Sequence, residues 1–428
     1  MNYPGYWFSD TYHYFICLRF IKRCLPGDAM LTEKQIQRYA DVLIWGLESA
    51  RAGKIKKGDV ILIRYDLPAV KLVEALYAKL LEMGVHPLQR LLQTPAMETY
   101  FYTLSNNRQL TFIPPGEEEL YHHLNGSIAV LGPSSLTHLS RVEPSKIAKP
   151  AKARKFLRDI LDRREDEGDF SWTLGMYPTE ELAAHAGISG EEYARQIIRA
   201  CFLNRKDPIG QWREIYKKAQ SLKNWLNRMS VDKFHVESAN IDLIVTPGEK
   251  RRWIGLSGHN MPSFELFTSP DWRGTHGVYY ADLPSYRSGN YVQGIRVEFK
   301  NGKVVSAKAE EGEGFLNKQL AMDNGANKIG EFSLTDRTFS KIDRFMANTL
   351  FDENFGGRYG NSHIALGASF SDAYSGKPSD LTKGLKEDLG FNDSALHWDI
   401  VNTEKKRVTA HLQSGQKKVI YENGRFAY

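Results

Sequence analysis

The sequence is poor in cysteine and lacks the short motifs of several large protein classes. Its three cysteines, Cys17, Cys24 and Cys201, show no CxxC spacing, which argues against a disulfide framework and against a thiolate metal site. Because HExxH and GxSxG patterns are missing, neither a single-helix zinc protease nor a nucleophile-elbow hydrolase is indicated. GxGxxG and P-loop patterns are missing too, so a dinucleotide site is unsupported. We expect no membrane span, since no apolar run is long enough, and a reducing cytoplasm as the location.

Composition and charge indicate a folded, water-soluble protein. The chain has 428 residues, 42% of them hydrophobic and 25% charged, enough for two or three domains with real cores. A net charge of +6 is too small to predict a nucleic-acid partner by itself. The densest basic run, residues 146–164, favours a solvated helix face after Pro150, with an acidic or nucleic-acid partner as the alternative.

The first 29 residues differ from the rest. They are rich in aromatic residues, and Arg19, Lys22 and Arg23 interrupt their only apolar patch, which is not the order of a signal peptide. Beyond them, Thr32 and Gln35 form a predicted capping box, followed by an apolar helical stripe over residues 36–47. We therefore expect the folded domain to begin at Met30, with residues 1–29 as an extension or the product of a mis-chosen start.

Residues 30–230 predict an α/β domain with a mainly parallel sheet. Residues 59–65 and 85–92 are typical of strands and residues 69–83 of an amphipathic helix, which together make a βαβ unit. Further strands are predicted at residues 127–132 and 170–178, and further helices at 151–164, 179–200 and 209–228.

Residues 231–428 predict a second, α+β domain with a largely antiparallel sheet. Alternating strand patterns dominate this half, and Asn301-Gly302 and Asn423-Gly424 are typical of tight hairpin turns. The boundary at residue 230 rests on this change of pattern.

Most acidic and imidazole groups in apolar settings belong to this second half. They are Glu265, Glu331, Glu353, His363, His397 and Asp399. Taken singly, a glutamate on a strand usually faces solvent, and a lone histidine is usually a satisfied polar residue. In a strand over residues 392–401, His397 and Asp399 would share one face about 7 Å apart, which suits either an ordinary His–Asp pair or two metal ligands.

As a set, these residues favour metal chemistry. Three glutamates, one aspartate and two histidines are the oxygen and imidazole donors that suit Zn²⁺, Co²⁺ or Mn²⁺. Carboxylates can also bridge two ions, as they do in two-metal hydrolases.

Several longer motifs resemble the aminopeptidase T family of metallo-aminopeptidases (aminopeptidases T, S and II). In chain order they are "NMPSFELFTSP", "GEF", "TLFDEN…GG…HIALG" and "NDSALHWDIV", and "GDFSWTLGMYPTEELAAHAGISGEEY" and "DPIGQW" in the first half are also similar to that family. The resemblance covers roughly residues 30 to 428.

The resemblance implies a centre of two divalent ions (Zn, Co or Mn). Glu265 and Glu331 match the family's early glutamate ligands, His363 matches the histidine ahead of "ALG", and His397 and Asp399 match the closing pair. Glu353 matches the glutamate of the "FDE" segment and is expected to be a bridging ligand or a base. Either Glu353 or Glu331 would take the proton from the attacking water.

The sequence departs from the family pattern at three places. Phe264 stands where the family usually has glycine, the loop over residues 354–362 is longer than is common, and Phe370 stands where the family has tyrosine. Tyr374 could supply the missing phenol as a catalytic group, or it could be an ordinary exposed loop residue.

The resemblance implies an aminopeptidase that removes the N-terminal residue of a peptide substrate, works as a homodimer and binds neither membrane nor nucleic acid. Two alternatives stay open. One is a catalytically weakened member that acts as a peptide-binding or scaffold protein, and the other is a nucleic-acid binder that uses residues 146–164.

Overall fold

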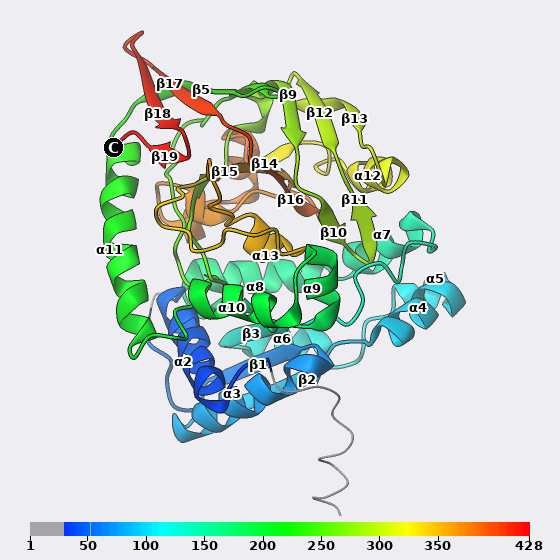
Figure 1. The fold of residues 1–428 in the computed structure, drawn as a ribbon. Coiled ribbons are helices and arrows are strands. Elements are labelled where there is room, and N and C mark those ends of the chain that lie inside the picture. Colours follow the sequence, from blue (N-terminus) through cyan, green and yellow to red (C-terminus); the bar gives the residue numbers. More distant parts are fainter. Residues whose placement is uncertain (1–29, 52) are drawn as a thin grey trace, which may run out of the picture.

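The computed structural model describes residues 30–51 and 53–428 (Figure 1). The predicted extension over residues 1–29, including Cys17 and Cys24, lies outside the described residues. The α-helices are α2 (Glu33–Ser49), α3 (Val70–Glu82), α4 (Pro95–Leu104), α5 (Asn107–Leu110), α6 (Glu117–His123), α7 (Pro144–Ala153), α8 (Lys155–Glu167), α9 (Glu180–Ala186), α10 (Gly190–Ala200), α11 (Pro208–Asn227), α12 (Glu313–Leu320), α13 (Thr349–Asp352) and α14 (Lys383–Asp388).

The first sheet is parallel and has the order β2-β1-β3-β4-β7. Its strands are β1 (Val60–Tyr65), β2 (His86–Leu91), β3 (Gly126–Leu131), β4 (Trp172–Met176) and β7 (Asn260–Met261). Helices α2 and α3 pack on the face that carries Ile61 and Ile63, whereas α6 and α8 pack on the face that carries Leu62. This arrangement confirms the predicted α/β layer, and β7 shows that the second half of the chain completes the sheet.

Two antiparallel sheets form most of the second half. One has eight strands in the order β13-β12-β9-β6-β5-β17-β18-β19, and the other has four in the order β16-β15-β14-β8. Their strands are β5 (Val231–Glu237), β6 (Asp242–Val245), β8 (Glu265–Thr268), β9 (His276–Ala281), β12 (Ile295–Lys300), β13 (Lys303–Lys308), β14 (Ile329–Thr335), β15 (Asn361–Gly367), β16 (His397–Asn402), β17 (Arg407–Leu412), β18 (Lys417–Glu422) and β19 (Arg425–Phe426). A small hairpin of β10 (Ser285–Arg287) and β11 (Asn290–Val292) stands apart.

Local sequence signals explain several element ends. The Thr32–Gln35 capping box is present, with both reciprocal hydrogen bonds made. Both hairpin turns are confirmed: Asn301 and Gly302 join β12 to β13 with φ of 50° and 75°, and Asn423 and Gly424 join β18 to β19 with φ of 52° and 78°.

Two predicted helices were wrong in their extent. The segment predicted as one helix over 179–200 forms α9 and α10, because Gly187 ends the first with a left-handed φ of 69° and Ser189 caps the second. The segment over 151–164 belongs to two helices, α7 and α8, which meet at Arg154, where φ and ψ are −97° and 3°.

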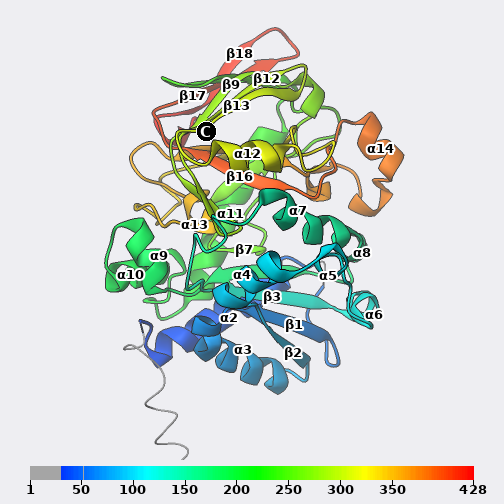
Figure 2. The ribbon, with the colours of Figure 1, turned by 90° about the vertical axis from the view of Figure 1, so that its right-hand side faces the viewer.

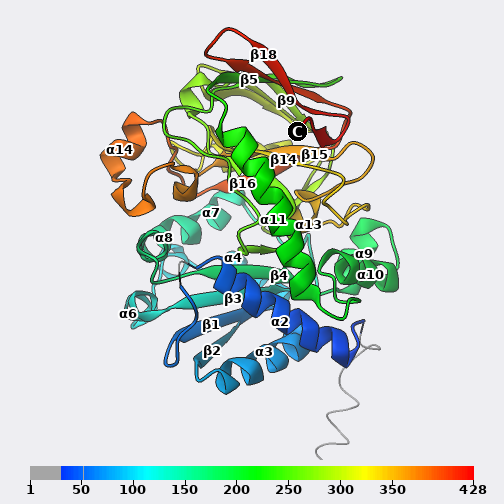
Figure 3. The same ribbon diagram turned by 90° about the vertical axis from the view of Figure 1, so that its left-hand side faces the viewer.

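The two halves of the chain share their cores. Helix α11 runs alongside both (Figure 3), and the second-half residues Phe264, Met346 and Phe351 pack in the core of the parallel sheet. Conversely, Tyr102 and Leu139 pack in the core of the antiparallel sheets. Figure 2 shows α7 and α8 lying between the two sheet regions. The division at residue 230 falls between α11 and β5 and stays a prediction.

Candidate metal centre

Strand register brings five of the predicted site residues to one face of the four-stranded sheet. Residues that pair across neighbouring strands point to the same side. His363 pairs with Ser333, which lies two residues from Glu331. Glu265 pairs with Thr335, Asp399 with Ala365, and His397 with Gly367, so all five share that face.

The opposite face of the same sheet is apolar. Leu266, Phe332, Ile364, Trp398 and Ile400 are each no more than 2% exposed and pack in the large core. The predicted alternation is therefore confirmed within β16: Trp398 and Ile400 anchor the strand, while His397 and Asp399 face the other way. The prediction of a strand from residue 392 was wrong, because β16 begins at His397. The core fixes which face carries the polar groups, because a one-residue slip would exchange the two.

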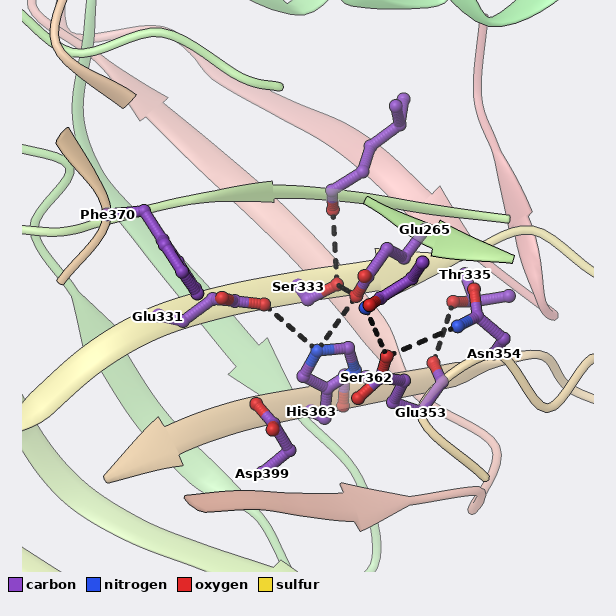
Figure 4. A network of polar contacts seen from close by, with 12 residues as sticks. Glu265, Glu331, Ser333, Thr335, Glu353, Asn354, Ser362, His363, Phe370 and Asp399 are labelled. Atoms are coloured by element: carbon purple, nitrogen blue, oxygen red, sulfur yellow. Dashed lines mark hydrogen bonds and ion pairs between the residues drawn. The ribbon is translucent and has the colours of Figure 1, made fainter. Parts of the chain in front are cut away.

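The donor atoms form two groups that share Glu331. In the first, His363 Nε2 lies 3.0 Å from Glu265 Oε2 and 3.1 Å from Glu331 Oε1. In the second, His397 Nε2 lies 3.8 Å from Glu331 Oε2 and 3.4 Å from Asp399 Oδ1. Figure 4 shows Glu265 and Glu331 converging on His363 from neighbouring strands.

Hydrogen bonds around the two histidines leave Nε2 of each ring directed at the carboxylates. His397 Nδ1 donates to the carbonyl oxygen of Ala368 at 2.9 Å, so Nε2 is the nitrogen free to bind a metal. His363 Nδ1 lies 3.5 Å from Asn361 Oδ1. Ser333 Oγ donates to Glu265 Oε2 at 3.0 Å, which orients that carboxylate.

Glu353 comes from outside the sheet, at the end of α13. Its carbonyl oxygen accepts hydrogen bonds from Thr335 Oγ1 and Asn361 Nδ2, which hold the turn over the polar face. Its Oε1 accepts from Asn260 Nδ2 at 3.0 Å and from Asn354 Nδ2 at 3.4 Å. Glu353 thus joins the same cluster, but it is in neither group of close donor atoms.

Electrostatics favour cations at this position. Burial raises the pKa of Glu331 to about 7, and burial together with the charges of Glu265 and Asp399 raises the pKa of Glu353 well above its usual range. Burial opposes protonation of His363, but hydrogen bonds with the two carboxylates and their charge hold its pKa well above the ordinary value. Four carboxylates accompany only two imidazoles, and such buried negative charge needs compensation. The donor set therefore fits divalent ions.

A cavity of about 1730 Å³ opens onto this face. Glu331, Glu353, His397 and Asp399 line it together with residues of the first half, including Trp172. This volume exceeds the 300–1,000 Å³ that is typical of small-molecule pockets, so a peptide can be accommodated.

Phe264 and Phe370 have structural roles beside the site. The Phe264 ring is 1% exposed and stacks on Trp212 at 5.3 Å, away from the carboxylate that follows it in the chain. The Phe370 ring packs edge-on against His397 at 4.8 Å between ring centroids. Phe264 therefore does not crowd the centre, whereas Phe370 supports one ligand ring without offering it an oxygen.

Tyr374 lies elsewhere. Its ring packs against Phe391 in a small apolar cluster, and among the described residues it is not one that lines the cavity. It is 7% exposed, so the alternative of an exposed loop tyrosine was wrong. Because its phenol is held in this cluster, we leave Tyr374 out of the proposed catalytic set.

Sequence reasoning missed the groups that support the ligands. Asn260, Asn354 and Asn361 position Glu353, and Ser333 orients Glu265. Ser333 lies two residues after Glu331 in the same strand, so strand alternation could have indicated that both side chains point to the same side of the sheet. Asn260 gave no signal, because its contact with Glu353 spans 93 residues of sequence.

The fold and the donor set define the class of the protein: an α/β domain completed by an antiparallel domain whose sheet carries a carboxylate–imidazole centre, as in metal-dependent hydrolases. Residues 32–426 match the family described as "Thermophilic metalloprotease (M29)", and the chain belongs to this family.

Similar proteins agree with this assignment. Aminopeptidase PepS of Streptococcus thermophilus is 28% identical over 302 residues, which cover 66% of this chain and 72% of that protein. Aminopeptidase 2 of Geobacillus stearothermophilus is 25% identical over 439 residues, covering 92% and 98%. The structure of wild-type AmpT from Thermus thermophilus matches with a TM-score of 0.74 at 23% identity and covers 93% of this chain and all of that one. The match in structure bears out the predicted fold.

Proposed function

We propose that this protein is a metallo-aminopeptidase that hydrolyses the N-terminal residue from peptides with two divalent ions. The observation that carries the proposal is the pair of donor groups sharing Glu331 on one face of a sheet. Glu265, His363 and Glu331 would hold one ion, and Glu331, His397 and Asp399 the other. When bound, such ions polarise the scissile carbonyl and lower the pKa of a water molecule towards neutrality.

The chain itself supplies proton transfer and positioning. Glu353 would take a proton from the water and return it to the leaving amine. The hydrogen bonds of Asn260 and Asn354 support this role, because they fix one of its oxygens and leave the other without a hydrogen bond in the described part of the chain. Residues of the first half, Trp172 among them, form part of the wall of the cavity in which this step would take place.

The relatives named aminopeptidases support the choice of peptide N-termini as the substrate. We extend the proposal to Zn²⁺, Co²⁺ or Mn²⁺ as the ions, to a homodimer and to a cytoplasmic location. Met97, Tyr100 and Leu104 of α4 are 57%, 62% and 78% exposed, an apolar face that supports contact with another subunit. Within the described residues, no helix is long and apolar enough to cross a membrane.

Metal removal tests the proposal. Chelation should abolish hydrolysis of leucine anilide, and adding Zn²⁺, Co²⁺ or Mn²⁺ should restore it. An N-acetylated peptide of the same sequence should not be cleaved at its first bond, because an aminopeptidase requires the free ammonium group. Hydrolysis that survives chelation, or equal cleavage of the blocked peptide, would contradict the proposal.

The alternative of a peptide-binding protein with weakened catalysis is supported by Phe370, which has no phenolic oxygen beside His397. Binding of a peptide to metal-loaded protein without turnover would favour it.

A further inference from the structure

A second group of metal-ligating side chains lines the same cavity outside the centre described above. It comprises Glu165 of α8, His259 just before β7, and Asp372 of the short 3₁₀-helix η3 (Ser371–Ala373). One ligand atom of each lies within 4.8 Å of the others. The three come from segments that are distant in sequence.

Neighbouring groups hold two of these side chains in place. Ser257 Oγ lies 2.7 Å from His259 Nδ1, so Nε2 of the ring faces Glu165. The Trp172 ring packs against the imidazole at 4.5 Å between centroids with a tilt of 34°, and its Nε1 donates to Glu165 Oε2 at 3.2 Å. Partners of this kind fix the ring orientation and the carboxylate of a metal site, and leave Nε2 and Oε1 as ligands.

Asp372 brings a second carboxylate to the pair formed by His259 and Glu165. Its carboxylate accepts no hydrogen bond from any described residue, and the nearby Arg252 donates its Nε–H to the Asp372 backbone carbonyl at 2.7 Å instead. Burial and the charge of Glu165 raise the pKa of Asp372. Two carboxylates therefore meet one imidazole at partly buried positions on the cavity wall.

We propose that Glu165, His259 and Asp372 bind a third divalent cation of the zinc type. One imidazole nitrogen and two carboxylate oxygens suit Zn²⁺, with a fourth position open to the cavity. His259 Nε2 and Glu165 Oε1 are 2.6 Å apart, a hydrogen-bond distance. Ligands of a tetrahedral zinc at about 2.0–2.1 Å would lie about 3.3 Å apart, so His259 and Glu165 need to separate by less than about 1 Å and to release their shared proton. The Asp372 carboxylate, which lies within 4.8 Å of the other two ligand atoms, would close the third side.

An ion bound to these three residues would hold this part of the cavity wall in place. The ion would join α8 of the first half to residues 257–259 and to η3 of the second half, beside the proposed peptide path. This role does not depend on the hydrolytic step.

Zinc stoichiometry tests this site. Full-length protein is freed of metal with a chelator and titrated with zinc, and the bound zinc per chain is measured by mass spectrometry of the element. We expect three ions in the wild type and two in Asp372→Asn and Glu165→Gln. Trp172→Phe keeps an aromatic ring but loses the indole N–H and its hydrogen bond to Glu165, so the affinity for the third ion should fall about 10–100-fold. Glu167→Gln, an exposed carboxylate of the same helix, is the control and should bind three.

The outcomes separate this site from the two-ion centre. If Asp372→Asn and Glu165→Gln bind as much zinc as the wild type with equal affinity, Glu165 and His259 are an ion pair and the proposal is wrong. If the wild type binds one zinc that Asp372→Asn loses, this site stands and the two-ion centre fails. Should Glu165→Gln fail to fold, Asp372→Asn still decides, because its side chain has no hydrogen bond to lose among the described residues.

Discussion

Replacing Glu353 by glutamine separates its two possible roles, ligand and base. Oε1 accepts the hydrogen bonds of Asn260 and Asn354, while Oε2 makes none with the described residues. Glutamine can place its oxygen where Oε1 lies and its amide nitrogen where Oε2 lies. The fold and the two amide contacts are then kept, and only the ability to accept a proton is lost.

The expected result is a fall in kcat of about 10²–10⁴-fold, the usual contribution of a general base. This corresponds to about 3–5 kcal/mol of activation free energy, at about 1.4 kcal/mol for each factor of ten. Metal content should be unchanged, since Glu353 belongs to neither group of close donor atoms. The assay is leucine anilide hydrolysis together with metal analysis of the same sample. Loss of an ion would make Glu353 a bridging ligand, and a kcat within tenfold of the wild type would refute its role as the base.

Three further changes probe the site and its surroundings. Glu331→Gln should reduce the content of both ions, because the two oxygens of Glu331 belong to different donor groups. Glu265→Gln and Asp399→Asn should each reduce the content of one ion only. Equal metal losses in all three variants would refute the role of Glu331 as a shared ligand. Phe370→Tyr should raise kcat, by up to about 10²–10³-fold if the new phenol stabilises the oxyanion, and an unchanged kcat at full metal content would show that it does not. Burial lowers the pKa of Lys406 to about 7, so its buried charge destabilises the fold fully below pH 7 and less as the pH rises towards 10. Lys406→Met should therefore raise Tm most at pH 6–7, with the gain shrinking by pH 10 in thermal unfolding; a gain that does not depend on pH would contradict this.

Much of the fold was predictable because local patterns and tertiary packing agree. Strand β1, helix α3 and strand β2 follow the βαβ pattern of the sequence, and the two Asn-Gly turns lie where two positive φ angles are needed. The two wrong helix predictions concern helix ends that lie inside polar segments of the sequence. The break between α9 and α10 depends on Gly187 and Ser189, which the helical periodicity on either side concealed.

The candidate ligands were predictable as a set but not as two groups. Alternation along one strand places His397 and Asp399 on one face. Only the pairing of β16 with β15, of β15 with β14 and of β14 with β8 shows that His363, Glu331 and Glu265 share that face. The sharing of Glu331 follows from its place on a central strand, between the strands that carry the other donors.

The remaining site residues could not be predicted, because they depend on contacts between the two halves of the chain. Strand β7 pairs with β4 as an edge of the parallel sheet, and this pairing brings His259 to Glu165 and Asn260 to Glu353. The first residue of this short strand and the residue before it thus contact two different acidic groups. A two-residue strand has too little pattern to be found in a sequence, so its effect is visible only after the whole sheet has formed. Variation in this segment would then alter both the proposed base and the proposed third cation site, which makes the edge of the first sheet a part of the catalytic cavity.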